Sequence, residues 1–275
     1  MTIDNRHATA EPWDNYWETK KRMIDIDKIT DFFVNLYFES GKFFIDYINK
    51  NQKKKFIELG CGGGTFLQYF YKKYENLEIF GIDISSKGVK ATLKRLNGGI
   101  PSKNIICDDI LKKQIQQIYD ISFSFGLIEH FDDPSVALKK HVDILKKDGI
   151  MICVIPNLVG LHNKILKSKI WFTKKEFENK SKDWIFGCRE ISIDSLKRWS
   201  KYSGLKDIKI LPIGGFLPLF LIETIRFNKK SKGRKIQILH RYCIFPFFIL
   251  LNMPTLFRLN SFTFSPYIII VGKKK

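Results

Sequence analysis

Short apolar segments alternate with longer amphipathic segments through the middle of the chain. Apolar runs lie at residues 56–59, 78–82 and 104–107, and the stretches between them carry apolar positions at helical spacing. Two further apolar runs follow at 120–124 and 149–155. Strands that alternate with helices pair in parallel through right-handed crossovers. The pattern therefore predicts an α/β fold with a doubly wound sheet.

The helices of this pattern are expected at residues 65–74, 86–96 and 134–146. After the fifth strand the alternation lapses until a helix at 193–203, which Gly204 ends. We expect the last two strands at residues 208–211 and 267–271, followed by a lysine tail. In such sheets, ligands bind beyond the carboxyl ends of the strands at the switch point.

One domain with additions accounts for the whole pattern. Residues 12–50 have apolar residues at roughly helical spacing, and we expect residues 1–50 to form an N-terminal helical cap. We assign the core to residues 51–211 together with 266–275. It contains an insertion at 157–192, rich in lysine and aromatic residues and expected on the substrate side. A second insertion, at 212–265, is hydrophobic and basic.

Composition excludes several classes of protein. With 275 residues, 44% hydrophobic and 14% aromatic, the chain can form a substantial core, which excludes a disordered or collagen-like protein. Five cysteines form neither an even set nor a CxxC pair, which argues against a disulfide framework and a structural zinc site. Residues 1–11 lack the apolar region of a secretory signal, so we expect a cytoplasmic protein.

The net charge of +19 has two interpretations. It would suit a nucleic-acid or anionic-membrane partner. It also fits lysines scattered over solvent-exposed positions, and we prefer this second interpretation. Only residues 228–241 are dense enough in Lys and Arg to form a basic cluster.

A glycine-rich loop follows the first predicted strand. The dinucleotide fingerprint GxGxxG would require glycine where Thr65 stands, and no Gly-Lys-Ser/Thr follows to make a Walker loop. The spacing GxGxG is satisfied by Gly60, Gly62 and Gly64. Without Cβ atoms this loop can approach a ligand closely, and we expect N–H groups at the helix start to face a carboxylate.

Acidic residues end the next two predicted strands. Asp83 ends the second strand, where a carboxylate accepts hydrogen bonds from ribose hydroxyls, a feature that fits NAD equally well. The third strand ends in Asp108 and Asp109, and an acid there can accept a hydrogen bond from an adenine amino group. Contacts to amino acid, sugar and base together indicate S-adenosylmethionine. A nicotinamide-dependent enzyme is the alternative, which Thr65 and the second acid disfavour.

Five motifs in order now carry a family resemblance: FIELGCGGG (56–64), IFGIDIS (79–85), IICDDI (105–110), YDISFSFGLIEHFDDP (119–134) and LKKDGIMICVIPN (145–157). In these motifs the chain resembles the class I S-adenosylmethionine-dependent methyltransferases, strongly over residues 53–157 and weakly beyond. The resemblance implies a Rossmann-like methyltransferase sheet, mostly parallel with an antiparallel last strand. It also implies S-adenosylmethionine as co-substrate and no metal.

The resemblance implies a cofactor site made of Glu58, Gly60, Cys61, Gly62, Gly64, Asp83, Ile84, Asp109, Ile110, Phe125 and Tyr16. The glycine loop would take the methionine part, with Glu58 fixing the loop. Asp83 would bind ribose, and Asp109 with the Ile110 amide would bind adenine. Phe125 would offer its carbonyl to the cofactor's amino group.

Simpler explanations stay open for several of these residues. Glu58 could be purely structural, and Asp108 or Asp109 could merely cap the following turn. Residues 13–17 (WDNYW) resemble the aromatic lid that many of these enzymes fold over the cofactor, which is why Tyr16 is included. Packing of an amphipathic helix would explain the same aromatic residues.

The segment after the fourth strand contains the candidate catalytic residues. In relatives resembling the ubiquinone-biosynthesis O-methyltransferases, an E-x-x-E-H segment binds a divalent metal, but Gly126 stands at the first position here. We therefore favour His130 as a general base or a residue lining the site, beside Glu129. His162 is a second candidate base, although a lone loop histidine is more often merely solvated.

The expected function is methyl transfer to a small-molecule, glycan-precursor or lipid-linked acceptor, with an oxygen nucleophile favoured. Nucleic acid is disfavoured because FGLIEH replaces the Asn/Asp-Pro-Pro-aromatic motif of N-methylating nucleic-acid enzymes. A non-catalytic cofactor-binding module is the alternative. The basic and apolar segment 229–259 suggests peripheral contact with the inner face of the membrane, but packing against the core or a partner subunit is preferred.

Overall fold

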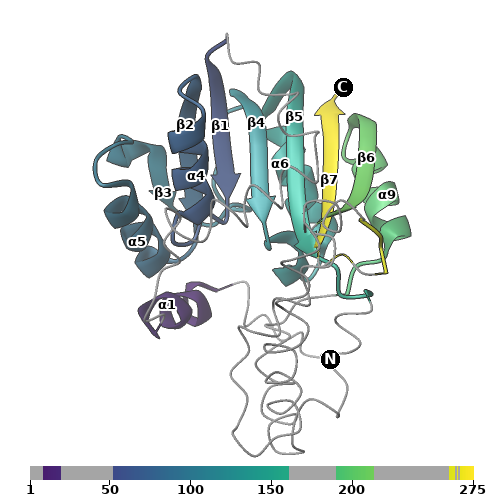
Figure 1. Cartoon of the computed structure of the whole chain (residues 1–275), viewed down its shortest axis with the longest axis horizontal. Coiled ribbons are helices and arrows are strands. Elements are labelled where there is room, and N and C mark those ends of the chain that lie inside the picture. The colour runs from purple at the N-terminus through teal and green to yellow at the C-terminus, as the bar shows by residue number, and fades with distance from the viewer. Residues whose placement is uncertain (1–8, 20–51, 161–189, 214–259, 264, 266) are drawn as a thin grey trace, which may run out of the picture.

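A single mixed sheet forms the centre of the molecule (Figure 1). The structure, a computed structural model, describes residues 9–19, 52–160, 190–213, 260–263, 265 and 267–275. Its seven strands are β1 (Lys54–Leu59), β2 (Leu77–Asp83), β3 (Ile105–Cys107), β4 (Tyr119–Phe125), β5 (Leu145–Pro156), β6 (Leu205–Ile213) and β7 (Tyr267–Lys274). They lie in the order β3-β2-β1-β4-β5-β7-β6.

The strand directions confirm the predicted doubly wound sheet. Strands β1 to β5 pair in parallel, and β7 runs antiparallel to both of its neighbours, β5 and β6. The strand order reverses between β1 and β4, which is the switch point where ligands bind in such folds. We call the side of the sheet where β1 to β5 end the carboxyl edge.

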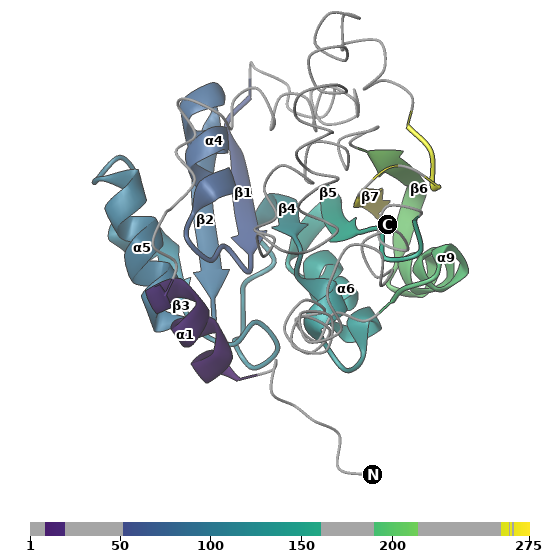
Figure 2. The ribbon, with the colours of Figure 1, turned by 60° about the horizontal axis from the view of Figure 1, so that its bottom comes forward.

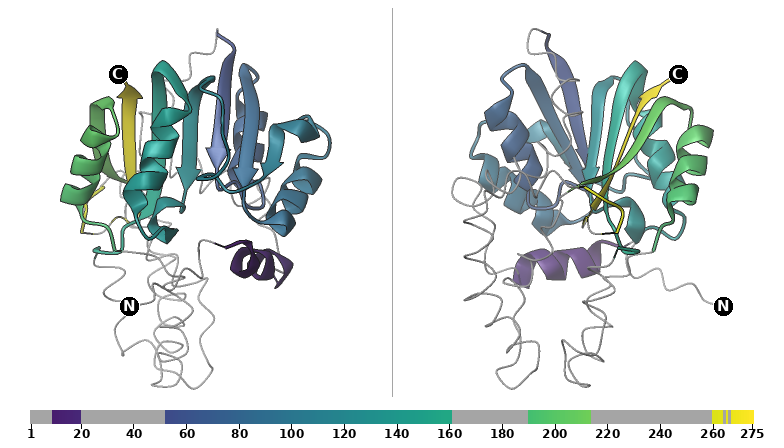
Figure 3. Two further views of the ribbon diagram at one scale, coloured as in Figure 1. Left: turned by 180° about the vertical axis from the view of Figure 1, so that it is seen from behind. Right: turned by 45° about the vertical axis from the view of Figure 1, so that its right-hand side comes forward.

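Helices cover both faces of the sheet (Figure 2). The described helices are α1 (Ala10–Thr19), α4 (Thr65–Lys73), α5 (Ser86–Leu96), α6 (Pro134–Asp143) and α9 (Ile193–Tyr202), with 3-10 turns η2 (Ser102–Asn104) and η3 (Ile128–His130). Side chains alternate between the faces along β1: Phe56 packs with α4 and α5, and the next residue, Ile57, packs with α6 and α9. Helix α1 lies outside both layers, below the carboxyl edge (Figure 3).

Some element boundaries differ from the prediction. The helix expected at 134–146 ends at Asp143, because Leu145 is fully buried and pairs with Tyr119 as the first residue of β5. Strand β7 continues to Lys274, and Lys273 pairs with Lys206 at the start of β6. Part of the expected lysine tail is therefore strand.

Most of the predicted additions lie outside the described residues. Of the expected helical cap at 1–50, the structure describes α1, and the insertions fall largely within 161–189 and 214–259. The basic cluster and the proposed membrane segment also lie there. Within the described part of the chain, no helix is both long and apolar enough to cross a membrane.

Candidate active site

The glycine loop connects β1 to α4 at the carboxyl edge. Gly60, Gly62 and Gly64 have φ angles of 71°, 49° and 71°, in the left-handed region that favours glycine. The N–H groups of Gly60 and Cys61 donate to the Ile82 carbonyl, that of Gly62 donates to Asp83, and that of Gly64 donates to the Cys61 carbonyl. Four of the five loop N–H groups are thus used within the protein.

Glu58 holds the start of α4 from the neighbouring strand. Its side chain is 2% exposed, and its carboxyl accepts a hydrogen bond from the backbone N–H of Leu67. Gly64, at the N-cap position of α4, has no side chain that could accept a hydrogen bond from the first N–H groups of the helix. Glu58 provides this cap instead. The helix-start N–H of Leu67 therefore faces a carboxyl group of the protein itself. Burial, and then the nearby charge of Asp83, raise the pKa of Glu58.

Helix α5 anchors the other side of the loop. The Thr92 hydroxyl donates to the Gly62 carbonyl at 2.6 Å, and the Arg95 Nε donates to the Gly63 carbonyl at 2.7 Å. Arg95 also donates to the Gln68 side chain in α4. Thr92 and Arg95 were not predicted from the sequence, because nothing in the spacing of the motifs links them to the loop.

Asp83 joins the glycine loop to the start of α5. It is 8% exposed, and its two carboxylate oxygens accept hydrogen bonds from the backbone N–H groups of Gly62, at 2.7 Å, and Ser85, at 2.8 Å. Burial raises its pKa. Each carboxylate oxygen retains a second lone pair, so the group can still accept hydrogen bonds from a ribose. Ile84 follows it, partly exposed, with its carbonyl oxygen 3.9 Å from the exposed Cys107 thiol.

The two acids after β3 both have protein partners. The Asp109 carboxylate accepts a hydrogen bond from the Leu111 N–H at 2.9 Å, so it does cap the following turn. Asp108 pairs with Lys113 at 3.1 Å, and the hydrogen bond from this lysine lowers the Asp108 pKa. Ile110 is buried. The adenine contact of Asp109 and Ile110 stays a prediction.

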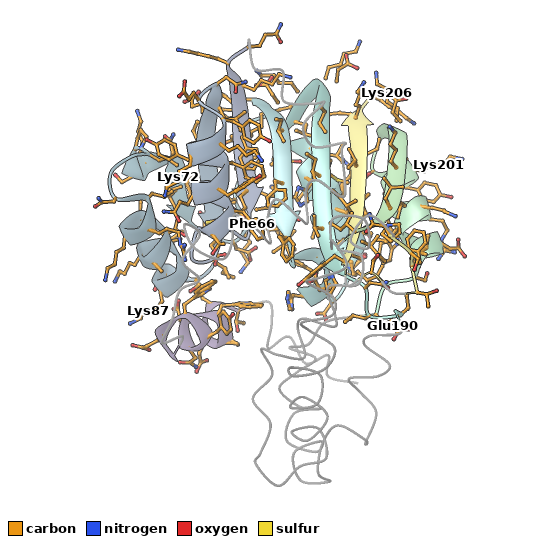
Figure 4. All side chains as sticks on the ribbon, viewed as in Figure 1. Phe66, Lys72, Lys87, Glu190, Lys201 and Lys206 are labelled. Atoms are coloured by element: carbon orange, nitrogen blue, oxygen red, sulfur yellow. The ribbon has the colours of Figure 1, made fainter. Side chains whose placement is uncertain are left out.

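The segment after β4 packs directly on the glycine loop. A Cβ atom on Gly60 would lie 2.7 Å from the Leu127 side chain, so the two segments are in close contact. Phe125, the last residue of β4, stacks on Phe66 at 4.6 Å between ring centroids and lies 4.8 Å from the Tyr267 ring. Figure 4 labels Phe66, which follows the loop at the start of α4. The residues after Phe125 are thereby held beside the expected cofactor site.

Glu129 and His130 lie in this segment and differ in exposure. Glu129 is 2% exposed, and burial raises its pKa to about 8. The His130 side chain is 10% exposed, and its Nε2 lies 3.9 Å from the Glu129 Oε1. The His130 ring also contacts the Trp13 ring edge to face, with centroids 4.8 Å apart. His130 is thus held between a buried carboxyl group and an indole of α1.

The described residues offer no metal centre. No three His, Cys, Asp or Glu side chains come together as ligands in this part of the chain. Gly126, which replaces the first carboxylate of the metal-binding segment, has a φ angle of 69° and brings no ligand. His162, the second candidate base, lies outside the described residues.

Helix α1 brings its aromatic residues to the site. Tyr16 packs edge to face with Trp13 and Trp17, with ring centroids 6.2 Å and 5.0 Å away. Trp17, which belongs to the aromatic segment 13–17 but was not among the residues expected to bind the cofactor, is the residue that touches the loop, since a Cβ atom on Gly62 would lie 2.3 Å from its ring. Asp14 accepts hydrogen bonds from the Ser85 hydroxyl and the Lys87 N–H at the start of α5.

These groups fit S-adenosylmethionine in their chemistry. The carboxyl edge offers a glycine loop with little side-chain bulk, a nearly buried carboxylate at the end of β2 and further acids at the end of β3. These are groups that can bind an amino acid, a ribose and an adenine. The seven-stranded sheet with its antiparallel β7 and this site define a class I S-adenosylmethionine-dependent methyltransferase.

Comparison with known proteins agrees with this class. The profile of a methyltransferase domain family matches residues 35–210, well over half of the chain. The chain therefore belongs to this methyltransferase family.

Curated relatives are distant. Malonyl-[acyl-carrier protein] O-methyltransferase 1 from Ilyobacter polytropus is 28% identical over 125 residues, which are 45% of this chain and 40% of that protein. Carboxy-S-adenosyl-L-methionine synthase from Nautilia profundicola is 25% identical over 230 residues, 78% of this chain and 86% of that protein. The chain thus spans less than half the length of the malonyl-[acyl-carrier protein] O-methyltransferase.

Solved structures share the fold. Geranyl diphosphate C-methyltransferase from Streptomyces coelicolor A3(2), in complex with Mg²⁺, geranyl diphosphate and S-adenosyl-L-homocysteine, superposes with a TM-score of 0.61 at 12% identity. The match covers 100% of this chain and 99% of that one. Phosphoethanolamine N-methyltransferase 2 from Haemonchus contortus gives a TM-score of 0.55 at 12% identity, over 95% of this chain and 60% of that one.

Proposed function

We propose that this protein transfers the methyl group of S-adenosylmethionine to an oxygen atom of a small-molecule, glycan-precursor or lipid-linked acceptor. The observation that carries the proposal is the position of His130. The segment containing it packs on the glycine loop through Leu127, and its ring is held by Trp13 and Glu129. A base beside the cofactor loop is what an oxygen nucleophile requires and an amine nucleophile does not.

In this proposal, the carboxyl edge binds and orients the cofactor. The loop from Gly60 to Gly64, with Cys61 in it, takes the methionine part. Asp83 and Ile84 bind the ribose, and Asp109 and Ile110 bind the adenine. Phe125 contributes its carbonyl, and Tyr16 belongs to the aromatic cover on α1. The bound cofactor supplies a methyl group already activated on a sulfonium, so the protein mainly aligns the reactants and excludes water.

His130 then removes the proton from the acceptor hydroxyl. Because burial raises the Glu129 pKa to about 8, this carboxyl is mainly protonated at neutral pH. Glu129 therefore acts as a neutral group that positions the His130 ring, without adding a negative charge beside it. The relative named as an O-methyltransferase supports an oxygen atom as the acceptor. The acceptor classes named above follow from the resemblance in the sequence motifs.

Mass spectrometry tests the reaction. The protein is incubated with S-adenosylmethionine and a panel of hydroxylated acceptors, including a sugar nucleotide, a phenol and an isoprenoid-linked sugar. We expect S-adenosylhomocysteine and an acceptor carrying one added methyl group, and we expect both to disappear with His130→Gln. Formation of a carboxylated S-adenosylmethionine would contradict the proposal. Cofactor binding with no methylated product from any acceptor would favour a non-catalytic binding module.

A further inference from the structure

Every glycine of the loop has its missing side-chain position filled by another residue of the same chain. A Cβ atom would lie 2.7 Å from Leu127 at Gly60, 2.3 Å from Trp17 at Gly62, 2.6 Å from Trp17 at Gly63 and 2.8 Å from Thr92 at Gly64. Leu127 and Thr92 sit in the body of the fold. Trp17 alone among these three belongs to a helix outside the two layers (Figure 3).

The Trp17 ring lies on the side of Gly62 and Gly63 where a Cβ atom would stand. The Gly62 N–H points to Asp83 and its carbonyl accepts the Thr92 hydroxyl, so both polar groups of this residue are directed into the protein. The Gly63 carbonyl is likewise bound by Arg95. The Trp17 ring covers the face of Gly62 and Gly63 to which a Cβ atom would point, so a ligand that contacts this face meets the ring.

Helix α1 is docked on the start of α5. The edge of the Trp17 indole rests against Gly88 of α5, where a Cβ atom would lie 3.1 Å from the ring. Asp14 accepts hydrogen bonds from the Ser85 hydroxyl at 2.6 Å and the Lys87 N–H at 3.0 Å. Glu18 pairs with Lys87 at 3.2 Å, an exposed ion pair that contributes little. Figure 4 shows Lys87 between α5 and α1.

We propose that Trp17 plugs the cofactor site: its indole occupies the side of the glycine loop that the methionine part of the cofactor needs, and α1 must move away from Gly62 and Gly63 before the cofactor binds. The ring is in contact with the Gly62 and Gly63 backbone, so it and a ligand touching the same atoms exclude each other. This inference rests on the assignment of the loop to the cofactor. It differs from an aromatic lid, which closes over a bound cofactor and strengthens its binding.

The plug and the lid predict opposite effects of removing the indole. If only the undocked state binds, the apparent Kd equals the intrinsic Kd divided by the undocked fraction. For a docked state populated ten to one, Trp17→Ala lowers the Kd for S-adenosylhomocysteine about tenfold. Asp14→Ala, which loosens α1 without touching the loop, lowers it in the same direction. Helix α5 keeps its own cap in this variant, because the Ser85 hydroxyl still accepts from the Gly88 N–H.

Titration calorimetry with S-adenosylhomocysteine measures these constants, and melting curves without ligand establish that each variant folds. Glu11→Ala, at an exposed position of the same helix, is the matched control and is expected to bind within about twofold of the unchanged protein. Stopped-flow binding adds a second readout. The association rate should level off with ligand concentration in the unchanged protein, where undocking limits it, and rise linearly in Trp17→Ala.

Weaker binding by Trp17→Ala would overturn the proposal, because it would mean that the indole contacts the bound cofactor. An unchanged Kd in both Trp17→Ala and Asp14→Ala would overturn it as well. Binding by Trp17→Ala alone, with none by the unchanged protein, would support it in its strongest form. Failure of every variant to bind would instead contradict the assignment of the loop to the cofactor.

Discussion

The Thr92 hydroxyl donates a 2.6 Å hydrogen bond to the carbonyl oxygen of Gly62, 30 residues earlier in the chain. This buried bond fixes the orientation of the Gly62 carbonyl at the centre of the glycine loop from the side of α5. Gly64 is in contact with the same side chain, since a Cβ atom there would lie 2.8 Å from Thr92. The shape of the loop thus depends on a residue of α5 that makes no part of the loop itself.

Thr92→Val should weaken cofactor binding. Valine keeps the shape of the side chain but leaves the buried Gly62 carbonyl without its donor, which costs about 1 to 3 kcal/mol. We expect the Kd for S-adenosylhomocysteine to rise at least several-fold in titration calorimetry. Thr92→Ser keeps the hydroxyl and serves as the control. Equal affinities for Thr92→Val and the unchanged protein would show that this bond does not shape the site.

His130→Gln should separate catalysis from cofactor binding. Loss of a general base typically lowers the rate by 10²- to 10⁴-fold. Since His130 is proposed to act on the acceptor, the Kd for S-adenosylhomocysteine should stay within about twofold. The rate is measured by mass spectrometry with the acceptor that the panel identifies. A near-normal rate would transfer the role to another residue, such as His162.

Acid should destabilise the fold through His141. This side chain is fully buried, its Nε2 lies 2.9 Å from the Ser124 hydroxyl, and burial lowers its pKa to about 3. Below pH 6.5 the unfolded chain takes up a proton that the folded protein refuses, so stability falls towards pH 3 by up to about 1.4 kcal/mol per unit. Urea unfolding between pH 7 and 5 measures this slope, which His141→Gln should reduce. An unaltered slope in the variant would refute the assignment.

Glu129 should act in the opposite direction. Because burial raises its pKa to about 8, the folded protein holds a proton that the unfolded chain releases above about pH 4.5. Its contribution to stability is therefore complete below pH 4.5 and is lost as the pH rises to 8. Glu129→Gln, which mimics the protonated form, should gain stability relative to the unchanged protein between pH 5 and 8. A constant difference across this range would contradict the proposed protonation state.

Membrane contact of residues 229–259 is the less favoured of the two interpretations drawn from the sequence, and these residues lie outside the described part of the chain. Basic residues near an anionic surface contribute about 1 kcal/mol each. If the segment docks at a membrane, the protein should sediment with anionic liposomes, less so at high salt. Charge reversal of Lys229, Lys230 and Lys232 should abolish binding, whereas reversal of Lys201 on α9 should not. No sedimentation at low salt would end the idea.

Local signals made much of the fold predictable. The helix at 86–96 has the bounds read from the sequence, because Ser85 caps its start and Asn97 ends it in a left-handed conformation. The predicted end of α6 was wrong. Leu145 fits the helical spacing of apolar residues, but it pairs with Tyr119 and belongs to the sheet. That pairing is a long-range contact which helical periodicity does not reveal.

The candidate site was predictable to a similar degree. Asp83 and the glycine loop could be recognised because Asp83 ends one strand and the loop directly follows another. The contacts of Thr92 and Trp17 with the loop could not, since they join helices whose relative positions depend on tertiary packing. Asp109 accepts a hydrogen bond within its own turn. An aspartate is also the residue type expected to bind the adenine, so the sequence alone does not distinguish a capping role from a ligand-binding role.

Calorimetry with S-adenosylhomocysteine and NAD tests the central claim most directly. A ligand that binds only the folded state stabilises it by about 2.7 kcal/mol at a hundredfold excess over its Kd. We predict this stabilisation, and a saturable binding isotherm, with S-adenosylhomocysteine but not with NAD. Both should be lost in Asp83→Ala, provided that this variant still melts cooperatively. Binding of NAD in place of S-adenosylhomocysteine, or unchanged binding by folded Asp83→Ala, would contradict the account.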